Sequence, residues 1–259
     1  MAIRVGHSAD PDDAFMAWAI EVGKVDTRGL EFELVPSDIQ TLNQWAVEGK
    51  LEVTALSAGA YPAVADRYVL LKHGASFGEG YGPIVVALEE LDPRDVEIVT
   101  PGPLTTATRV LKRALGAGVR TRDMPFDEVL DEVVSGRAEA GLLIHEGQLT
   151  YADYGLHKLL DLGVWWQDET GLPLPLGVVA AKRDLDRLTD VSAVIREAID
   201  VGLAHRDEAM QYAIDFGRGI DAATADEFVA MYVNELTLDM GERGREALAL
   251  LLDLDPEFA

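Results

Sequence analysis

Short apolar runs of strand length alternate with stretches of helical periodicity along most of the chain. This alternation is typical of βαβ units and predicts an α/β fold with parallel strands. The predicted strands are Ala2–Val5, Glu31–Val35, Leu51–Leu56, Tyr68–Lys72, Pro83–Leu88, Val96–Thr100 and Ala138–Ile144. The predicted helices are Asp12–Val22, one ending at Val47, Ser57–Val64, Leu104–Leu115, Phe126–Val134, Val191–Ala204, Asp207–Phe216, Ala222–Tyr232 and Glu242–Leu252.

Two polar clusters coincide with predicted helix starts. Asp10-Pro11-Asp12-Asp13 fits an N-cap, a proline in the first turn and two carboxylates at the positive end of the helix dipole. Ser37-Asp38-Ile39-Gln40 matches a capping box. The alternative for the first cluster is a divalent metal held together with His7, but the spacing matches no standard ligand loop. We therefore predict helix capping there and no metal site.

The size and composition indicate a folded protein with two lobes. The chain has 259 residues, above the usual size of one domain, and 48% of them are hydrophobic. No apolar run approaches the length of a membrane span, and the N-terminus lacks the apolar stretch of a signal peptide. We therefore expect a cytoplasmic protein. There is no cysteine, which excludes disulfides, thiolate catalysis and zinc–cysteine sites.

The charge of the chain argues against two classes of partner. Asp and Glu number 46 against 22 Lys and Arg, for a formal net charge of −24. Nucleic acids and anionic membranes are bound through basic patches, and the sequence has no basic cluster. We expect neither as a partner. Such an acidic surface is also compatible with a salt-rich cytoplasm, where counterions screen self-repulsion.

Polar residues follow four of the predicted strands. They are His7-Ser8, Ser57, Thr105-Thr106 and His145-Glu146. In open α/β sheets ligands bind beyond the carboxyl ends of strands, often against the N-terminus of the next helix. Hydroxyls and free backbone N–H groups at these junctions are able to hold a carboxylate without Lys or Arg. The pattern predicts a cleft for a small anionic metabolite.

Each of these features also has a purely structural interpretation. A Ser or Thr at a helix start is usually an N-cap, and a single histidine is more often structural than catalytic. His145 is the candidate general base because it directly follows a buried strand at the cleft end. Gly78–Gly82 is interpreted as an inter-lobe or rim loop, since it lacks the remaining residues of a phosphate-binding motif. Trp165-Trp166 is interpreted first as packing, and second as an aromatic wall for a ring-bearing ligand.

Several segments, in order and at compatible spacing over nearly the whole chain, resemble the 1,4-dihydroxy-6-naphthoate synthase family of the futalosine route to menaquinone. The segments are Ser8–Phe15, Thr41–Trp45, Leu56-Ser57 with Tyr61, Pro101–Thr106, Gly141–Glu146 and Asp161–Trp166 continuing through Gly171–Gly177. The last of these, with Trp-Trp followed by Leu-Pro-Leu-Pro-Leu-Gly, is the most specific.

The resemblance implies a fold like type II periplasmic binding proteins, with a ligand cleft between two α/β lobes. One lobe is expected to comprise residues 1–86 and 178–259, and the other residues 87–177. The implied reaction breaks cyclic dehypoxanthinyl futalosine into 1,4-dihydroxy-6-naphthoate and a sugar-derived fragment, without a cofactor or metal. Substrate contacts are then expected from Ala55, Leu56, Ser57, Thr105 and Thr106, with His145 as the proton acceptor. The implied partner is an anionic aromatic-carboxylate metabolite, and the implied assembly a monomer or homodimer.

The chain departs from the family in one segment. Where the family usually has Pro-Cys-Pro-Asn-Asp-Thr, this chain has Ala9-Asp10-Pro11-Asp12-Asp13-Ala14, which adds negative charge and removes a hydroxyl. Two other functions stay open: a chorismate dehydratase of the same pathway and fold, and a non-catalytic binding protein for small anionic solutes. The segments around His145 and Trp165 favour the lyase over the dehydratase.

Overall fold

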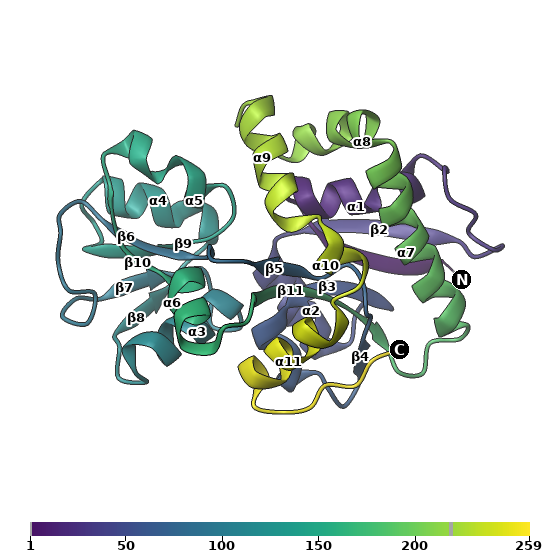
Figure 1. Cartoon of the computed structure of the whole chain (residues 1–259), viewed down its shortest axis with the longest axis horizontal. Helices are drawn as coiled ribbons and strands as arrows, with labels where there is room; N and C mark the ends of the chain where they lie inside the picture. The colour runs from purple at the N-terminus through teal and green to yellow at the C-terminus, as the bar shows by residue number, and fades with distance from the viewer. Residues whose placement is uncertain (1, 218–219) are drawn as a thin grey trace.

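Two separate β-sheets organise the chain, as seen in a computed structural model that describes residues 2–217 and 220–259 (Figure 1). The first sheet has the order β2-β1-β3-β11-β4, with β5 also paired to β11. Its strands are β1 (Ile3–Ser8), β2 (Phe32–Ser37), β3 (Val53–Ser57), β4 (Tyr68–Leu70), β5 (Ser76–Gly78) and β11 (Leu174–Lys182). Around it lie α1 (Pro11–Glu21), α2 (Ile39–Glu48), the 3₁₀ turns η1 (Ala58–Ala63) and η3 (Ile214–Phe216), α7 (Leu188–Ala204), α8 (Arg206–Ala213), α9 (Ala222–Tyr232), α10 (Glu235–Leu238) and α11 (Gly241–Leu252). Together these elements form the first lobe.

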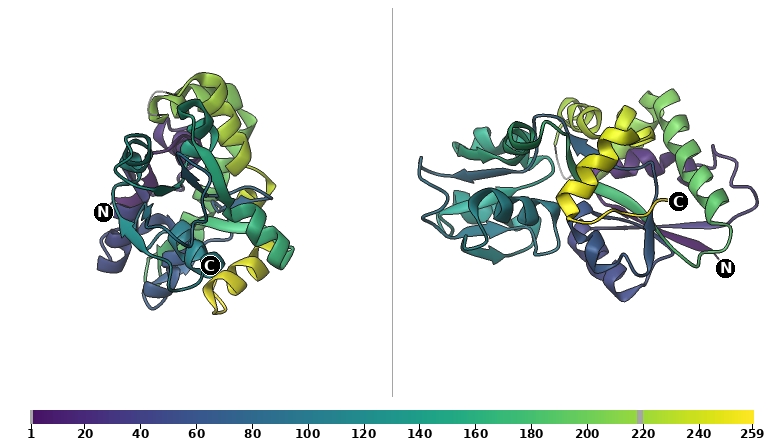
Figure 2. Two further views of the ribbon diagram at one scale, coloured as in Figure 1. Left: turned by 90° about the vertical axis from the view of Figure 1, so that its left-hand side faces the viewer. Right: turned by 60° about the horizontal axis from the view of Figure 1, so that its bottom comes forward.

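The second sheet has the order β10-β6-β9-β7-β8 and forms the second lobe. Its strands are β6 (Ile84–Ala87), β7 (Ile98–Thr100), β8 (Thr121–Asp123), β9 (Ala140–Leu143) and β10 (His157–Asp161). It is accompanied by α3 (Thr106–Leu115), α4 (Phe126–Val134), α5 (Gly147–Thr150), the 3₁₀ turn η2 (Tyr151–Tyr154) and α6 (Leu162–Thr170). The right-hand view of Figure 2 shows the two lobes side by side along the long axis of the molecule.

The chain passes between the lobes twice. It leaves the first sheet after β5 and returns to it in β11, so the segment Gly78–Gly82 spans the lobes, as predicted. The expected divisions, after residues 86 and 177, fall inside β6 and β11. One buried apolar cluster includes Leu56 and Val178 of the first sheet together with Val85 and Ile98 of the second. The lobes therefore share a core where the crossing strands run.

Both sheets are mixed, and the prediction of parallel strands was wrong in part. β1 pairs in parallel with β2 and β3, and β7 with β8 and β9. β11, however, runs antiparallel to β3, β4 and β5, and β6 runs antiparallel to β9 and β10. β6 and β11 are the strands in which the chain enters a sheet after crossing between the lobes.

The packing of α2 on the first sheet depends on one glycine and on a helix cap. A Cβ atom at Gly6 in β1 would lie 2.5 Å from the Leu51 side chain and 2.8 Å from the Leu42 side chain, so a larger residue there would displace both leucines. The α2 N-cap is Asp38, whose carboxylate accepts from the Thr41 N–H at 2.9 Å. The capping group is therefore Asp38 rather than Ser37, the residue that the capping-box pattern indicated.

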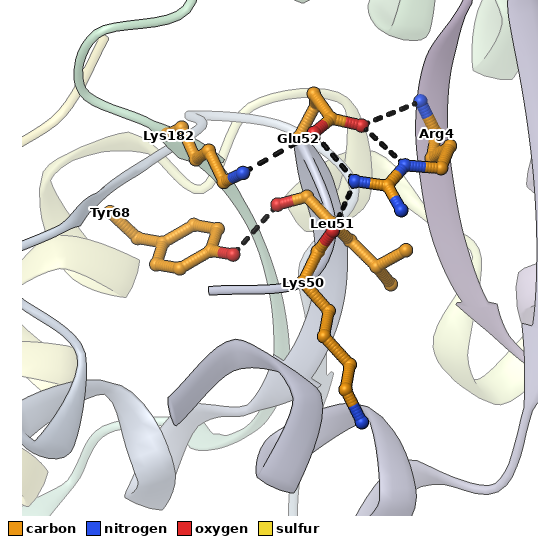
Figure 3. Close-up of polar contacts among 6 residues, drawn as sticks. All are labelled: Arg4, Lys50, Leu51, Glu52, Tyr68 and Lys182. Carbon is orange, nitrogen blue, oxygen red and sulfur yellow. Dashed lines mark hydrogen bonds and ion pairs between the residues drawn. The ribbon is translucent and has the colours of Figure 1, made fainter. Parts of the chain in front are cut away.

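A network of charged side chains joins strands of the first sheet at the end away from the cleft (Figure 3). Glu52 accepts from Arg4 Nε at 2.9 Å and from Lys182 Nζ at 3.2 Å, so that one carboxylate links β1, the start of β3 and the end of β11. These hydrogen bonds, with Arg4 first, lower the pKa of Glu52 to about 2. No helix among the described residues is long and apolar enough to cross a membrane.

Candidate functional site

A cleft of about 710 Å³, partly open to solvent, lies between the lobes. It is lined from both sides, and all six residues singled out in the sequence reach it: Ala55, Leu56, Ser57, Thr105, Thr106 and His145. The first three end β3 in the first lobe, and the other three follow β7 and β9 in the second. The carboxyl ends of strands therefore meet at the cleft, as the junction pattern predicts. The roles of these residues stay predictions.

The turn from β1 into α1 brings three aspartates to the cleft, and the prediction that they cap α1 was wrong for Asp10. Asp10 stands at the N-cap position, but its side chain makes no capping hydrogen bond. Its carboxylate instead accepts a hydrogen bond from the Ser8 hydroxyl. The Ser8 backbone N–H donates to Asp13 Oδ2 at 2.6 Å. These carboxylates line the ligand space with Asp12.

The aspartates are electrostatically coupled. Burial, followed by the charges of Asp13 and Asp10, raises the pKa of Asp12 well above its usual range. Burial likewise raises the pKa of Asp13 to about 7; the hydrogen bond from Ser8 opposes this rise, and the charge of Asp10 adds to it. Like charges confined in one site cannot all ionise at neutral pH. The cleft is thus less negative at neutral pH than three aspartates suggest, which lowers the cost of admitting an anion.

His145 follows β9 and enters the cleft from the second lobe. Its φ of 54° lies in the left-handed region that non-glycine residues rarely adopt. The ring packs edge-on against Phe126 at 5.0 Å between centroids, and Phe228 lies 6.5 Å away. Nδ1 lies 3.3 Å from Asp10 Oδ2, whereas Nε2 is buried and without a hydrogen-bond partner among the described residues. A nitrogen in this state, in a cleft, is suited to take a proton from a ligand.

Ser57 is held at the end of β3 by one side chain. Asn43 on α2 accepts from the Ser57 N–H at 2.8 Å and donates to the Ser57 hydroxyl oxygen at 3.1 Å. Since the hydroxyl oxygen accepts from Asn43, its proton can be donated to a ligand in the cleft. Asn43 is completely buried.

The two threonines at the start of α3 have structural hydrogen bonds, and the N-cap interpretation is confirmed for Thr105. The Thr105 hydroxyl donates to the Gly102 carbonyl at 2.8 Å and caps α3 by accepting from the Thr108 N–H. The Thr106 hydroxyl donates to the Leu176 carbonyl at 2.7 Å and accepts from the Gly59 N–H at 2.9 Å. Both hydroxyl protons are therefore engaged within the protein. The groups left for an anion are the Thr106 and Ala107 backbone N–H groups, which have no partner within the helix.

The C-terminal helix α9 supplies a wall of the cleft that sequence reasoning missed. Phe228 and Tyr232 line the cleft, and their rings pack edge-on at 5.0 Å. Gln148 on α5 reaches the same space from the second lobe. The spacing of Phe228 and Tyr232, four residues apart on a predicted helix, marks one helix face. It does not tell which part of the protein that face meets.

Three other expectations concern residues outside the cleft. Trp166 is fully buried and donates to the Pro173 carbonyl at 3.1 Å, and Trp165 packs partly buried against the same apolar core, so the packing interpretation of the pair is confirmed. Neither tryptophan lines the cleft. His7 points to the opposite side of β1, where its ring lies 6.2 Å from Phe216. Across the part of the chain that the structure describes, no group of three or more His, Asp or Glu side chains is arranged to hold a metal ion.

Comparisons with known proteins agree with this geometry. The model of a family described as menaquinone biosynthesis matches residues 3–256. A 1,4-dihydroxy-6-naphthoate synthase from Thermus thermophilus is 40% identical over 253 residues, which are 96% of this chain and 92% of the relative. The synthase of the same name from Streptomyces coelicolor is 34% identical over 258 residues, covering 96% of this chain and 91% of the relative.

Solved structures support the same fold. A crystal structure of an Archaeoglobus fulgidus protein superimposes with a TM-score of 0.92 at 46% identity, over 96% of this chain and 95% of the other. A Candida albicans protein described as having the generic periplasmic binding protein fold superimposes with a TM-score of 0.71 at 14% identity, over 97% and 90% of the two chains. The expected two-lobed, periplasmic-binding-protein-like fold is confirmed.

Proposed function

Because the chain belongs to the menaquinone-biosynthesis family, we propose that it is a 1,4-dihydroxy-6-naphthoate synthase. In this proposal it is a carbon–carbon lyase that converts cyclic dehypoxanthinyl futalosine into 1,4-dihydroxy-6-naphthoate and a sugar-derived fragment in the cytoplasm. The observation that carries the proposed mechanism is the state of His145: Nε2 is buried in the cleft and has no partner within the described protein.

In the proposed reaction, the site removes a proton from the substrate. His145 Nε2 takes a proton next to a carbonyl or hydroxyl of the substrate, which starts ring opening and cleavage of a carbon–carbon bond. Formation of the aromatic diol drives the reaction forward. The rings of Phe126 and Phe228 keep solvent away from the imidazole while the substrate is bound.

The substrate carboxylate is proposed to bind at the start of α3. The first turn of α3 presents backbone N–H groups at its positive end, beside Ala107, which lines the cleft. The Ser57 hydroxyl proton is directed to the same ligand. Leu56, Ile144 and Leu176 add apolar lining, which suits an aromatic ring between these polar contacts.

The test is turnover by the purified protein, with cyclic dehypoxanthinyl futalosine and chorismate supplied in separate reactions and products identified by mass spectrometry. We expect product from the first substrate only. His145→Asn should lower kcat by about 10²-fold or more, the range of a lost general base, while substrate binding measured by calorimetry changes little. Dehydration of chorismate, or full activity of the variant, would reject the proposed reaction or the proposed base, respectively.

A further inference from the structure

A carboxylate from the first lobe and an imidazole from the second meet across the cleft. Asp10 ends the turn after β1, and His145 follows β9. Asp10 Oδ2 lies 3.3 Å from His145 Nδ1, and the Asp10 side chain is 2% exposed. This contact joins the two lobes, in a site where water has little access to the carboxylate.

Asp10 stands at the N-cap position of α1 but does not cap the helix with its side chain. Asp38, Asp161 and Asp221 occupy the N-cap positions of their helices and accept hydrogen bonds from backbone N–H groups of the first turn. Asp10 occupies the same position on α1 and makes no such bond. An uncapped helix start is destabilising, so the orientation of Asp10 toward the cleft has to be stabilised by other contacts.

Two such contacts are those with Ser8 and His145, and they involve the same oxygen. The Ser8 hydroxyl donates to Asp10 Oδ2, which is also the atom nearest His145 Nδ1. Ser8 is itself buried at the end of β1. The carboxylate is therefore held from the strand and directed at the histidine.

The orientation of the His145 ring is also restrained, so that it faces Asp10. Its left-handed backbone and its edge-on contact with Phe126 fix the direction of the ring. With Nδ1 directed at Asp10, the ring nitrogen left within the cleft is Nε2, which has no partner in the described structure. A hydrogen bond at one ring nitrogen decides which nitrogen carries the proton.

We propose that Asp10 is the positioning residue for His145: it accepts the Nδ1–H, keeps Nε2 unprotonated as the base, and stabilises the imidazolium that forms when Nε2 takes the substrate proton. Because the two residues belong to different lobes, the pair is complete only when the lobes are closed. The inference rests on the proposed role of His145 as the base.

The surrounding charges are consistent with a carboxylate at this position. The charge of Asp10 raises the pKa of both Asp12 and Asp13, which places the negative charge of the cluster next to His145. From the other elements packed around the ring, α4 contributes Phe126 and α9 contributes Phe228, with the tyrosine hydroxyl of α9 nearby.

The first test needs no substrate. In protein labelled with ¹⁵N-histidine, at a pH where the imidazole is neutral, long-range ¹H–¹⁵N spectra report which nitrogen carries the proton. The His145 signal is identified by its absence from His145→Asn. We expect the Nδ1–H form in the wild type and a majority of the Nε2–H form in Asp10→Ala. The Nε2–H form in the wild type, or an unchanged ratio in the variant, would overturn the inference whatever the protein's substrate is.

The second test is the pH profile of kcat/KM. In Asp10→Asn we expect kcat to fall by about 100-fold, with the acidic limb of the profile moved to lower pH because the imidazolium has lost its counter-charge. Ser8→Ala, which keeps the carboxylate but releases it, should give a smaller loss in the same direction. Asp168→Asn, which removes one exposed carboxylate, is the control and should leave the profile unchanged.

These results separate the inference from the proposed function. A correct tautomer in a protein that does not convert cyclic dehypoxanthinyl futalosine would reject the substrate and keep the pair. Normal conversion with an acidic limb that does not move in Asp10→Asn would keep the function and reject the positioning role. A circular dichroism spectrum identical to that of the wild type confirms that each variant is folded.

Discussion

The Tyr232 hydroxyl on α9 donates a hydrogen bond of 3.1 Å to Gln148 Oε1 on α5, and so joins the first lobe to the second at the edge of the cleft. Burial raises the pKa of Tyr232 far above that of a free phenol, which keeps the hydroxyl protonated as a donor. The ring itself stays packed against Phe228 and Tyr81. The bond therefore stabilises the closed arrangement of the lobes without being part of the proposed chemistry.

Tyr232→Phe should weaken closure and leave the ring packing in place. The loss of one buried hydrogen bond corresponds to about 1 kcal/mol, so we expect KM to rise roughly fivefold with a smaller change in kcat. Steady-state kinetics would measure both, and small-angle X-ray scattering of the free variant should show a larger radius of gyration. Gln148→Glu, which retains an acceptor for the Tyr232 hydroxyl, serves as the matched variant. Unchanged KM and scattering in Tyr232→Phe would contradict a role in closure.

Thr106→Val should be more destabilising than its small change in shape suggests. The Thr106 hydroxyl joins the Gly59 N–H of η1 to the Leu176 carbonyl of β11, and valine would leave both of these half-buried groups unpaired. We expect a loss of about 2 kcal/mol in the free energy of unfolding, measured by urea denaturation. Thr106→Ser keeps the hydroxyl and should retain most of the stability. Equal losses in the two variants would mean that the methyl group, not the hydroxyl, is what matters.

Asp13 should make the protein less stable as the pH rises toward neutrality. The pKa of Asp13 is about 7 in the folded protein, whereas the usual pKa of an aspartate, expected in the unfolded chain, is 3.8. At pH values between these two, the folded state retains a proton that the unfolded state has released. The free energy of unfolding therefore falls with rising pH across this window.

Asp13→Asn is the variant that isolates this effect. Asparagine stays neutral and still accepts from the Ser8 N–H, so it removes the titration and keeps the hydrogen bond. Asp13 is partly open to the cleft, and water there reduces the penalty of ionisation, so we expect the wild type to lose about 2 kcal/mol relative to the variant between pH 4 and pH 8. Urea unfolding at several pH values measures the difference. Parallel curves for the two proteins would show that Asp13 is not buried as an acid.

Local patterns predicted some elements of this fold to the residue. Helices α4 and α9 begin and end where the sequence indicated, since each has an apolar face of helical period and a boundary signal, Pro125 before α4 and Asp221 before α9. β11 was missed. It contains Pro175 and Gly177, which weaken a strand pattern, and it is held by β3, β4 and β5, more than 90 residues earlier in the chain.

Some features of the candidate site were likewise predictable from the sequence, and others were not. The ends of β3, β7 and β9 were identifiable because the carboxyl edge of a sheet is determined by the direction of its strands, and the resemblance to a known family pointed to the same residues. The threonine hydroxyls at the start of α3 were expected to face a ligand, and only the fold showed that they are already bonded to Gly102 and Leu176.

By itself the sequence determined most of the helices, most of the strands and the strand ends that reach the cleft, because backbone hydrogen bonding and side-chain periodicity act over a few residues. Only the tertiary structure decided what Asp10 does. Its local surroundings are those of a helix cap, and its partner, His145, is 135 positions away on the other lobe. The Asp10 carboxylate has two available roles, capping α1 and contacting His145, and it takes the one that the packed structure stabilises more. The contact with His145 does not exist until the two lobes come together, so the residues around Asp10 in the sequence do not reveal it.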